Sequence, residues 1–167
     1  MNSRMFNARN FAAVAVTASL LAFSAAGSGA ADNPFTQLIG NWAGSGKITV
    51  SNGSNERIRC RGMYRPADKG GLGLNLRCAS DSYKFELASD IAYEGSGNIT
   101  GSWNEASRGI FGTLAGRATA GLVQANASSV GFSATLLIRT VGNSQTVTMR
   151  SPGSEISEVS ITLMRGK

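Results

Sequence analysis

The residues best suited to chemistry in this sequence are four arginines: Arg57, Arg59, Arg61 and Arg77. The first three occupy alternate positions of residues 56–64, which puts their side chains on one face of an extended strand. Guanidinium groups bind phosphates and carboxylates through paired hydrogen bonds. The four arginines are therefore candidate binding residues for a small or polymeric anion.

A second interpretation of these arginines is a solvated outer face. Nearby carboxylates at Glu56, Asp81 and Glu86 could neutralise them. If Arg61 faces Arg77 across a hairpin, the like charges destabilise the pair by up to about 1 kcal/mol, so some compensation is expected.

Two tryptophans, Trp42 and Trp103, are the other candidate ligand-binding residues. Either ring could stack on a sugar or line a ligand cavity. Each could equally fill the core, because a buried tryptophan removes on the order of 200 Å² from water.

The composition argues against catalysis. The chain contains no histidine, which removes the commonest general base and metal ligand. Glu105 is the acid worth testing, but no partner acid is identifiable. We therefore expect a protein that is not an enzyme, with no catalytic residue, metal or cofactor. Nucleic-acid binding is disfavoured because no aromatic residues alternate with the arginines.

The arginines lie in a predicted hairpin that also holds both cysteines. Residues 56–64 and 72–78 alternate as strands, and a Pro- and Gly-containing turn joins them. If the hairpin is symmetric about Lys69, Cys60 lies across from Cys78 and both point to the core. A disulfide closing this loop would contribute roughly 3 kcal/mol. Free thiols and an intermolecular bridge are the alternatives.

Apolar residues recur at every second position in short segments between residues 40 and 165. Apart from one helical turn at 33–39, no segment has the spacing of a helix. This pattern predicts an all-β fold of about eight to ten short antiparallel strands, either an up-and-down barrel or a meander sandwich. An outer-membrane barrel is disfavoured because aromatic residues are few and form no girdle.

Residues 1–31 have the pattern of a signal peptide. Arg4 and Arg9 precede an uncharged apolar run at 11–23, and small residues follow. The run is shorter than the roughly 20 residues that span a bilayer, although a retained anchor is the alternative. We expect a single domain at 32–167 that is periplasmic or secreted. Removal of residues 1–31 takes away Arg4 and Arg9 and lowers the net charge from +6 to +4. A net charge of this size is weak evidence for a polyanionic partner.

The predicted barrel resembles the calycins: lipocalins, fatty-acid-binding proteins and avidins. In those families a Gly-x-Trp on the first strand packs against a basic residue on the last, and the matching positions here are Gly40, Trp42 and Arg165. The segment 99–103 is similar to the Thr-Gly-x-aromatic strands of avidins, but the biotin contacts do not match. The whole chain resembles small exported proteins of alphaproteobacteria.

A further resemblance is to small exported barrels with one disulfide that inhibit bacterial metalloproteases. In those proteins an N-terminal trunk enters the protease cleft, a part that residues 31–37 could play. The leading expectation is capture of a small or anionic ligand in the barrel mouth or on the arginine face. The alternative is a module for a protein partner, such as a periplasmic protease inhibitor.

Overall fold

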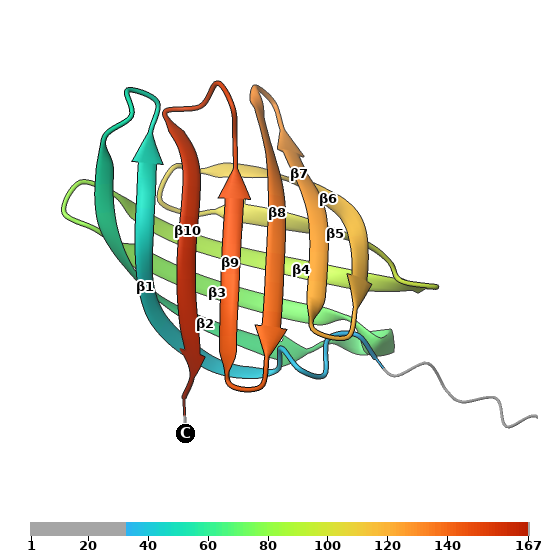
Figure 1. Ribbon diagram of the computed structural model, residues 1–167. Coiled ribbons are helices and arrows are strands. Elements are labelled where there is room, and N and C mark those ends of the chain that lie inside the picture. The colour runs from blue at the N-terminus through green and yellow to red at the C-terminus, as the bar shows by residue number, and fades with distance from the viewer. Residues whose placement is uncertain (1–32, 167) are drawn as a thin grey trace, which may run out of the picture. The chain divides into compact units, whose positions relative to one another are not determined.

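Alternating apolar and polar residues produce ten strands in the computed structural model, which describes residues 33–166 (Figure 1). Short turns join them, so each strand is antiparallel to the next. The strands are β1 (Gly40–Val50), β2 (Asn55–Pro66), β3 (Leu72–Ala79), β4 (Lys84–Gly95), β5 (Asn98–Glu105), β6 (Ile110–Thr119), β7 (Leu122–Ser129), β8 (Phe132–Val141), β9 (Ser144–Arg150) and β10 (Ile156–Arg165).

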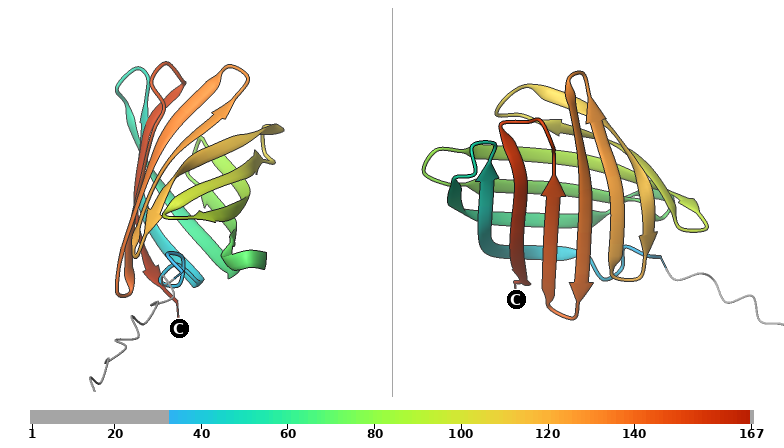
Figure 2. Two further views of the ribbon diagram at one scale, coloured as in Figure 1. Left: turned by 90° about the vertical axis from the view of Figure 1, so that its right-hand side faces the viewer. Right: turned by 45° about the horizontal axis from the view of Figure 1, so that its top comes forward.

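The sheet closes on itself because β1 pairs with both β2 and β10. Closure leaves no free strand edge, which removes the usual template for edge-to-edge aggregation. The prediction of an up-and-down antiparallel barrel is confirmed. The views in Figure 2 show β8, β9, β10 and β1 as one wall and β3, β4 and β5 as the wall facing it.

Glycines allow neighbouring strands to approach closely where the sheet curves. A Cβ at Gly44 would clash with the carbonyl oxygen of Thr162 on β10, and one at Gly112 would clash with that of Ser128 on β7. Gly116 is in the same situation against the next strand. The glycines at positions 112 and 116 thus allow close backbone approach between strands.

The alternation at 83–87 predicts one strand and residues 90–98 a further short strand or turn, and this division of the region is wrong. A single twelve-residue strand, β4, covers most of the region. Its register against β5 shifts between Tyr93 and Gly95. That irregularity lets the strand continue to a tight turn in which Ser96 has a φ of 51°.

A turn at 33–38, where the sequence predicts one helical turn at 33–39, closes one end of the barrel. Hydrogen bonds from Thr36 N to Asn33 O (3.1 Å) and from Leu38 N to Phe35 O (2.8 Å) form it. Phe35 and Leu38 are each 1% exposed. The indole N–H of Trp42 donates to the Leu38 carbonyl at 2.7 Å, which ties the turn to β1.

The predicted disulfide is present between Cys60 and Cys78. The two residues pair directly across β2 and β3, and Arg61 pairs with Arg77 one position along. The connecting turn reverses at Lys69, which has a positive φ of 53°. Both sulfurs face the core, so the covalent link fixes the register that holds the neighbouring arginines on the outer face.

Within residues 33–166 no helix has the length and apolar character needed to cross a bilayer. The expected signal peptide lies outside the described residues.

Candidate ligand-binding lumen

Several inward-facing apolar side chains halfway along the barrel are only partly buried, although Ile161, which pairs with Val147, is 2% exposed. Strand alternation points Leu87 towards the axis from one wall and Val147 from the other. A filled core would bury such side chains as completely as it buries Leu163, which is 0% exposed. Part of their apolar surface is therefore left uncovered by other side chains. The partly buried apolar residues with inward orientation include Leu76, Phe85, Leu87, Leu136, Ile138, Val147, Met149 and Val159.

The small side chains of β6 and β7 explain why the axis is not filled. The inward positions of β7 carry Val123, Ala125 and Ala127, and β6 contributes Gly112 and Gly116. These residues add little volume to the interior on that side. The large inward residues of β3, β4, β8 and β9, such as Leu76, Leu87, Leu136 and Val147, are only partly buried.

The closed end of the lumen has a polar floor whose hydrogen bonds are satisfied. The Tyr64 hydroxyl donates to Gln145 Oε1 at 2.9 Å, and Gln145 Nε2 donates to the Thr140 hydroxyl at 3.1 Å. Burial raises the pKa of Tyr64, so its phenol stays neutral. Among the described residues no buried side-chain polar atom lacks a partner.

The end of the barrel opposite the 33–38 turn is referred to as the open end, and two contacts there join opposite walls. Trp103 on β5 packs edge-on against Phe132 on β8, with ring centroids 5.6 Å apart. The Tyr83 hydroxyl donates to Glu155 Oε1 at 3.0 Å, which raises the pKa of Tyr83. Trp103 is 8% exposed. The loops at this end are residues 51–54, 80–83, 106–109, 130–131 and 151–155.

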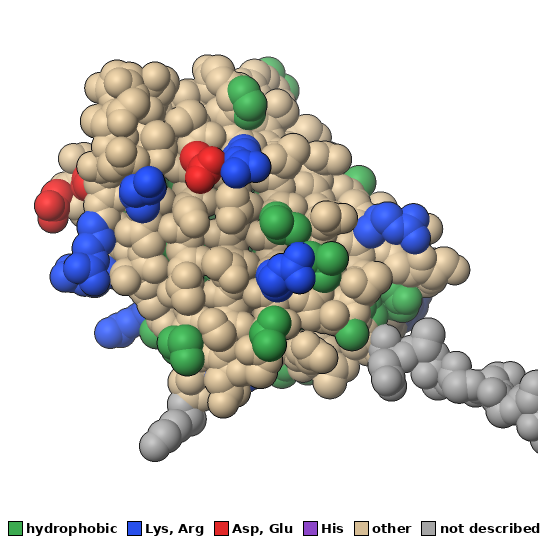
Figure 3. All heavy atoms as spheres, viewed as in Figure 1, with side chains coloured by type: hydrophobic (Ala, Val, Ile, Leu, Met, Phe, Trp, Pro, Cys, Tyr) green, Lys and Arg blue, Asp and Glu red, His purple; other side chains and the backbone are tan. Residues whose placement is uncertain are grey.

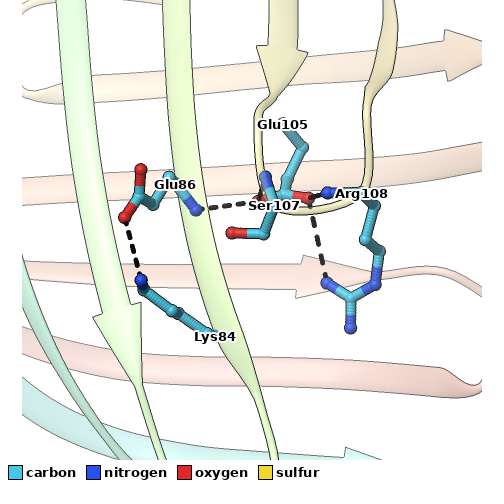
Figure 4. A network of polar contacts seen from close by, with 5 residues as sticks. All are labelled: Lys84, Glu86, Glu105, Ser107 and Arg108. Atoms are coloured by element: carbon cyan, nitrogen blue, oxygen red, sulfur yellow. Dashed lines mark hydrogen bonds and ion pairs between the residues drawn. The ribbon is translucent and has the colours of Figure 1, made fainter.

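The turn between β5 and β6 is held by one buried carboxylate, Glu105 (Figure 4). Its Oε1 accepts the backbone N–H groups of Glu86 (2.8 Å) and Ser107 (3.1 Å), and its Oε2 accepts that of Arg108 (2.8 Å). Burial acts to raise the pKa of Glu105, but these amide hydrogen bonds outweigh it and the pKa lies below its usual value. Glu105 is thus a structural anchor of this turn.

Sequence reasoning considered Glu105 but did not single out Arg108. The Arg108 guanidinium lies over the Phe85 ring, 4.8 Å from its centroid, and 3.9 Å from Glu105 Oε2. Phe85 faces inward from the start of β4, so this places a cation on the inner rim of the lumen. The (i, i+3) spacing of the charged pair was the one available signal, and a loop position carries no periodicity to support it.

The four predicted arginines are brought together on the outer faces of β2 and β3, and all are exposed. Figure 3 shows Lys and Arg side chains gathered along the edge where β1 and β2 lie. The carboxylates expected to neutralise these arginines, Glu56 and Glu86, have other partners. Glu86 pairs with Lys84 at 3.3 Å, and Glu56 accepts the Ser82 N–H. Within residues 33–166 no carboxylate forms an ion pair with Arg57, Arg59, Arg61 or Arg77.

Trp42 lies at the closed end, 1% exposed, and away from the open end of the lumen. The Arg165 guanidinium lies over its ring at 4.3 Å and donates hydrogen bonds to the Ile39 and Gln37 carbonyls. Gly40 has a φ of 128° and its missing Cβ would lie 3.0 Å from Arg165 Nη1. The three residues thus form a packed structural unit, the arrangement that the calycin resemblance implies.

Residues 33–37, the described part of the segment that could enter a protease cleft, also pack against this closed end. Asn33 donates through its side chain to the Gly70 carbonyl at 2.9 Å, and Phe35 packs edge-on against Tyr93 at 6.3 Å. Residues 33–37 are therefore not free to enter a cleft in another protein. Residues 31 and 32 lie outside the described range.

The lumen wall is mainly aliphatic, with Phe85, Trp103 and Phe132 near the open end. Two shallow depressions lie outside the barrel along β6–β9, beside outward residues such as Asn126 and Thr135.

Comparisons with known proteins agree with the barrel. No protein-family model matches the sequence, and no curated protein matches it. The resemblance to exported alphaproteobacterial proteins therefore stays a prediction. Among solved structures, Rv2717c from M. tuberculosis is similar with 15% identity and a TM-score of 0.62, over 80% of this chain and 95% of that chain. The S-type phycobiliprotein lyase CPES from Guillardia theta is similar with 9% identity and a TM-score of 0.56, over 80% and 90%. At these identities the likeness shows a shared barrel fold.

Proposed function

We propose that this protein is an exported binding protein that captures a small, largely apolar ligand in the lumen of its barrel. The observation that supports this proposal most directly is the partial exposure of inward apolar side chains on both walls, such as Leu87 and Val147. Leaving such surface in contact with water is unfavourable, and a ligand that covered it would gain that free energy.

The distribution of polar groups supports an axial orientation for the ligand. Tyr64 and Gln145 at the floor already satisfy each other, so the inner end of the ligand is apolar. The open end carries hydroxyl, carboxylate and guanidinium groups at Tyr83, Glu155 and Arg108. An amphiphile with its chain inwards and its head at the mouth fits this arrangement.

Binding without turnover is part of the proposal. The chain has no histidine, and the described residues contain no group of three or more His, Cys, Asp or Glu side chains able to hold a metal ion. The carboxylate of Glu105 is engaged by three backbone amides. The disulfide supports export, since such bonds persist mainly in oxidising compartments. Amino-terminal sequencing of protein recovered outside the cytoplasm tests export directly.

A series of 1-alkanols from hexanol to decanol tests the proposed lumen. Each buried methylene contributes about 0.8 kcal/mol, so the affinity should rise up to about fourfold per carbon with one-to-one stoichiometry. Native mass spectrometry gives the stoichiometry and calorimetry the affinity. Affinity that does not depend on chain length, or binding of many molecules without saturation, would contradict a defined lumen.

An anionic partner on the arginine face is a second candidate function, favoured by the absence of ion pairs to the four arginines within the described chain. Neutralising Arg61 and Arg77 together with glutamine should weaken retention on a polyphosphate column and reduce its salt dependence. Arg139, an exposed residue on the outer face of β8, provides the control as Arg139→Gln. Equal loss in the control would indicate a general charge effect instead of a site.

A further inference from the structure

Arg108 occupies an unusual position for a loop arginine. It lies in the β5–β6 turn, yet its guanidinium leans over the ring of Phe85, which faces the lumen. Its side chain is 35% exposed. The charged group therefore sits at the junction between the apolar lumen and the solvent.

The hydrogen-bonding capacity of this guanidinium is unused within residues 33–166. Its Nη1 approaches Glu105 Oε2 only to 3.9 Å, beyond hydrogen-bond distance. Glu105 itself is already satisfied by three backbone N–H groups. Lys84 and Arg150 near the same end are ion-paired with glutamates at 3.3 and 2.9 Å, whereas the ion pair of Arg108 with Glu105 is the longest of the three at 3.9 Å. Arg108 thus presents a fork of N–H donors to whatever occupies the mouth.

The same contacts hold Arg108 in place before any ligand arrives. Glu105 Oε2 accepts the Arg108 backbone N–H at 2.8 Å, which fixes the turn, and the Phe85 ring supports the guanidinium plane. Two acids at this end, Glu56 and Glu155, accept hydrogen bonds from the Ser82 N–H and the Tyr83 hydroxyl. A side chain positioned in advance loses less entropy when it binds.

We propose that Arg108 binds the carboxylate head group of an amphiphile whose apolar chain occupies the lumen. This inference rests on the proposed function, because the head group is placed at the rim only if the chain lies inside. A planar carboxylate matches the guanidinium fork with two parallel hydrogen bonds. Arg108 would then determine the preference for an acid over a neutral ligand of the same length.

Decanoate and decan-1-ol share a chain and differ in the head group, so they separate the two claims. Their affinities are measured by calorimetry at pH 7.5 and low salt for the wild type, Arg108→Gln, Arg108→Lys and Arg139→Gln. We expect the wild type to prefer decanoate, and Arg108→Gln to bind decanoate at least tenfold more weakly. Binding of decan-1-ol should change less than twofold, and Arg108→Lys should fall between because it keeps the charge but loses the fork. Arg139→Gln removes an outer-face charge and should match the wild type.

Each other outcome counts against a specific claim. One such outcome is that the wild type binds decan-1-ol and decanoate equally, and another is that Arg108→Gln weakens the binding of both ligands equally. Either result would show that the proposed role of Arg108 is wrong, while binding in the lumen would still be supported. If the wild type binds neither compound, the proposed function fails as well. Arg108→Gln retains the backbone N–H that Glu105 accepts, and its unfolding temperature verifies that the turn is intact.

Discussion

The Cys60–Cys78 disulfide should contribute about 3 kcal/mol to the free energy of unfolding. The cysteines are 18 residues apart, and cross-linking a loop of that length removes about 11 cal/mol/K of chain entropy from the unfolded state, or about 3 kcal/mol at 25 °C. Reduction is the cleaner perturbation because it leaves both sulfur atoms in place. Alanine replacements would add a cavity penalty, since Cys60 and Cys78 are 2% and 6% exposed.

Urea unfolding of the oxidised and reduced protein, followed by tryptophan fluorescence, measures this contribution. With a slope of about 2 kcal/mol/M, the midpoint should fall by about 1.5 M on reduction. Seven further residue pairs keep β2 and β3 in register, so the reduced protein should still fold at low urea. A midpoint shift below about 0.3 M would refute the reasoning, because the cross-link would then contribute well under 1 kcal/mol.

Three further predictions concern the closed end, the β5–β6 turn and strand curvature. Arg165→Met keeps an apolar stem over Trp42 but removes the cation and its hydrogen bonds to two carbonyls. Thermal unfolding should show that the free energy of unfolding falls by about 2–4 kcal/mol. A fall below about 0.5 kcal/mol would be evidence against the packed unit. Glu105→Gln should destabilise the fold at pH 7, and this difference should shrink as the pH is lowered into the acid range. Because the folded-state pKa of Glu105 lies below the unfolded value, the carboxylate stabilises the fold above the unfolded pKa, and this is lost as the pH falls through the folded pKa. A pH-independent difference in urea midpoints would contradict that assignment. Gly116→Ala should lower the unfolding temperature by several degrees, because its Cβ would clash with the Gln124 carbonyl, whereas the outward neighbour substitution Ala115→Ser should not.

The fold could be predicted from the sequence where strict alternation meets a clear turn. The hairpin around Lys69 is the best case, since its symmetry correctly pairs Cys60 with Cys78 and Arg61 with Arg77. The prediction was wrong for residues 83–98, where the alternation at 83–87 suggested one strand and residues 90–98 a further short strand or turn. There a register irregularity absorbs the mismatch and one strand continues.

The candidate site was harder to predict because it depends on contacts between distant residues. Tyr64 and Gln145 are 81 positions apart, and no local pattern links them. Whether the lumen is filled depends on the total volume of the inward side chains of all ten strands. Small residues on β6 and β7 lie opposite large ones, and no local pattern shows this balance. Arg108 lies in a turn, where side-chain direction follows from the Glu105 hydrogen bonds and not from periodicity.

The most direct test of the open lumen is a fluorescence titration with the neutral apolar probe N-phenyl-1-naphthylamine on two variants of adjacent residues. Val147→Phe places a ring in the lumen, and Thr146→Phe places the same ring on the outer face of β9. The account predicts saturable one-to-one binding to the wild type and to Thr146→Phe, and at least tenfold weaker binding to Val147→Phe with little change in unfolding temperature. The opposite result would contradict it: no probe binding by the wild type, together with a loss of about 1–3 kcal/mol of stability in Val147→Phe, because overpacking of that size requires a core that is already full.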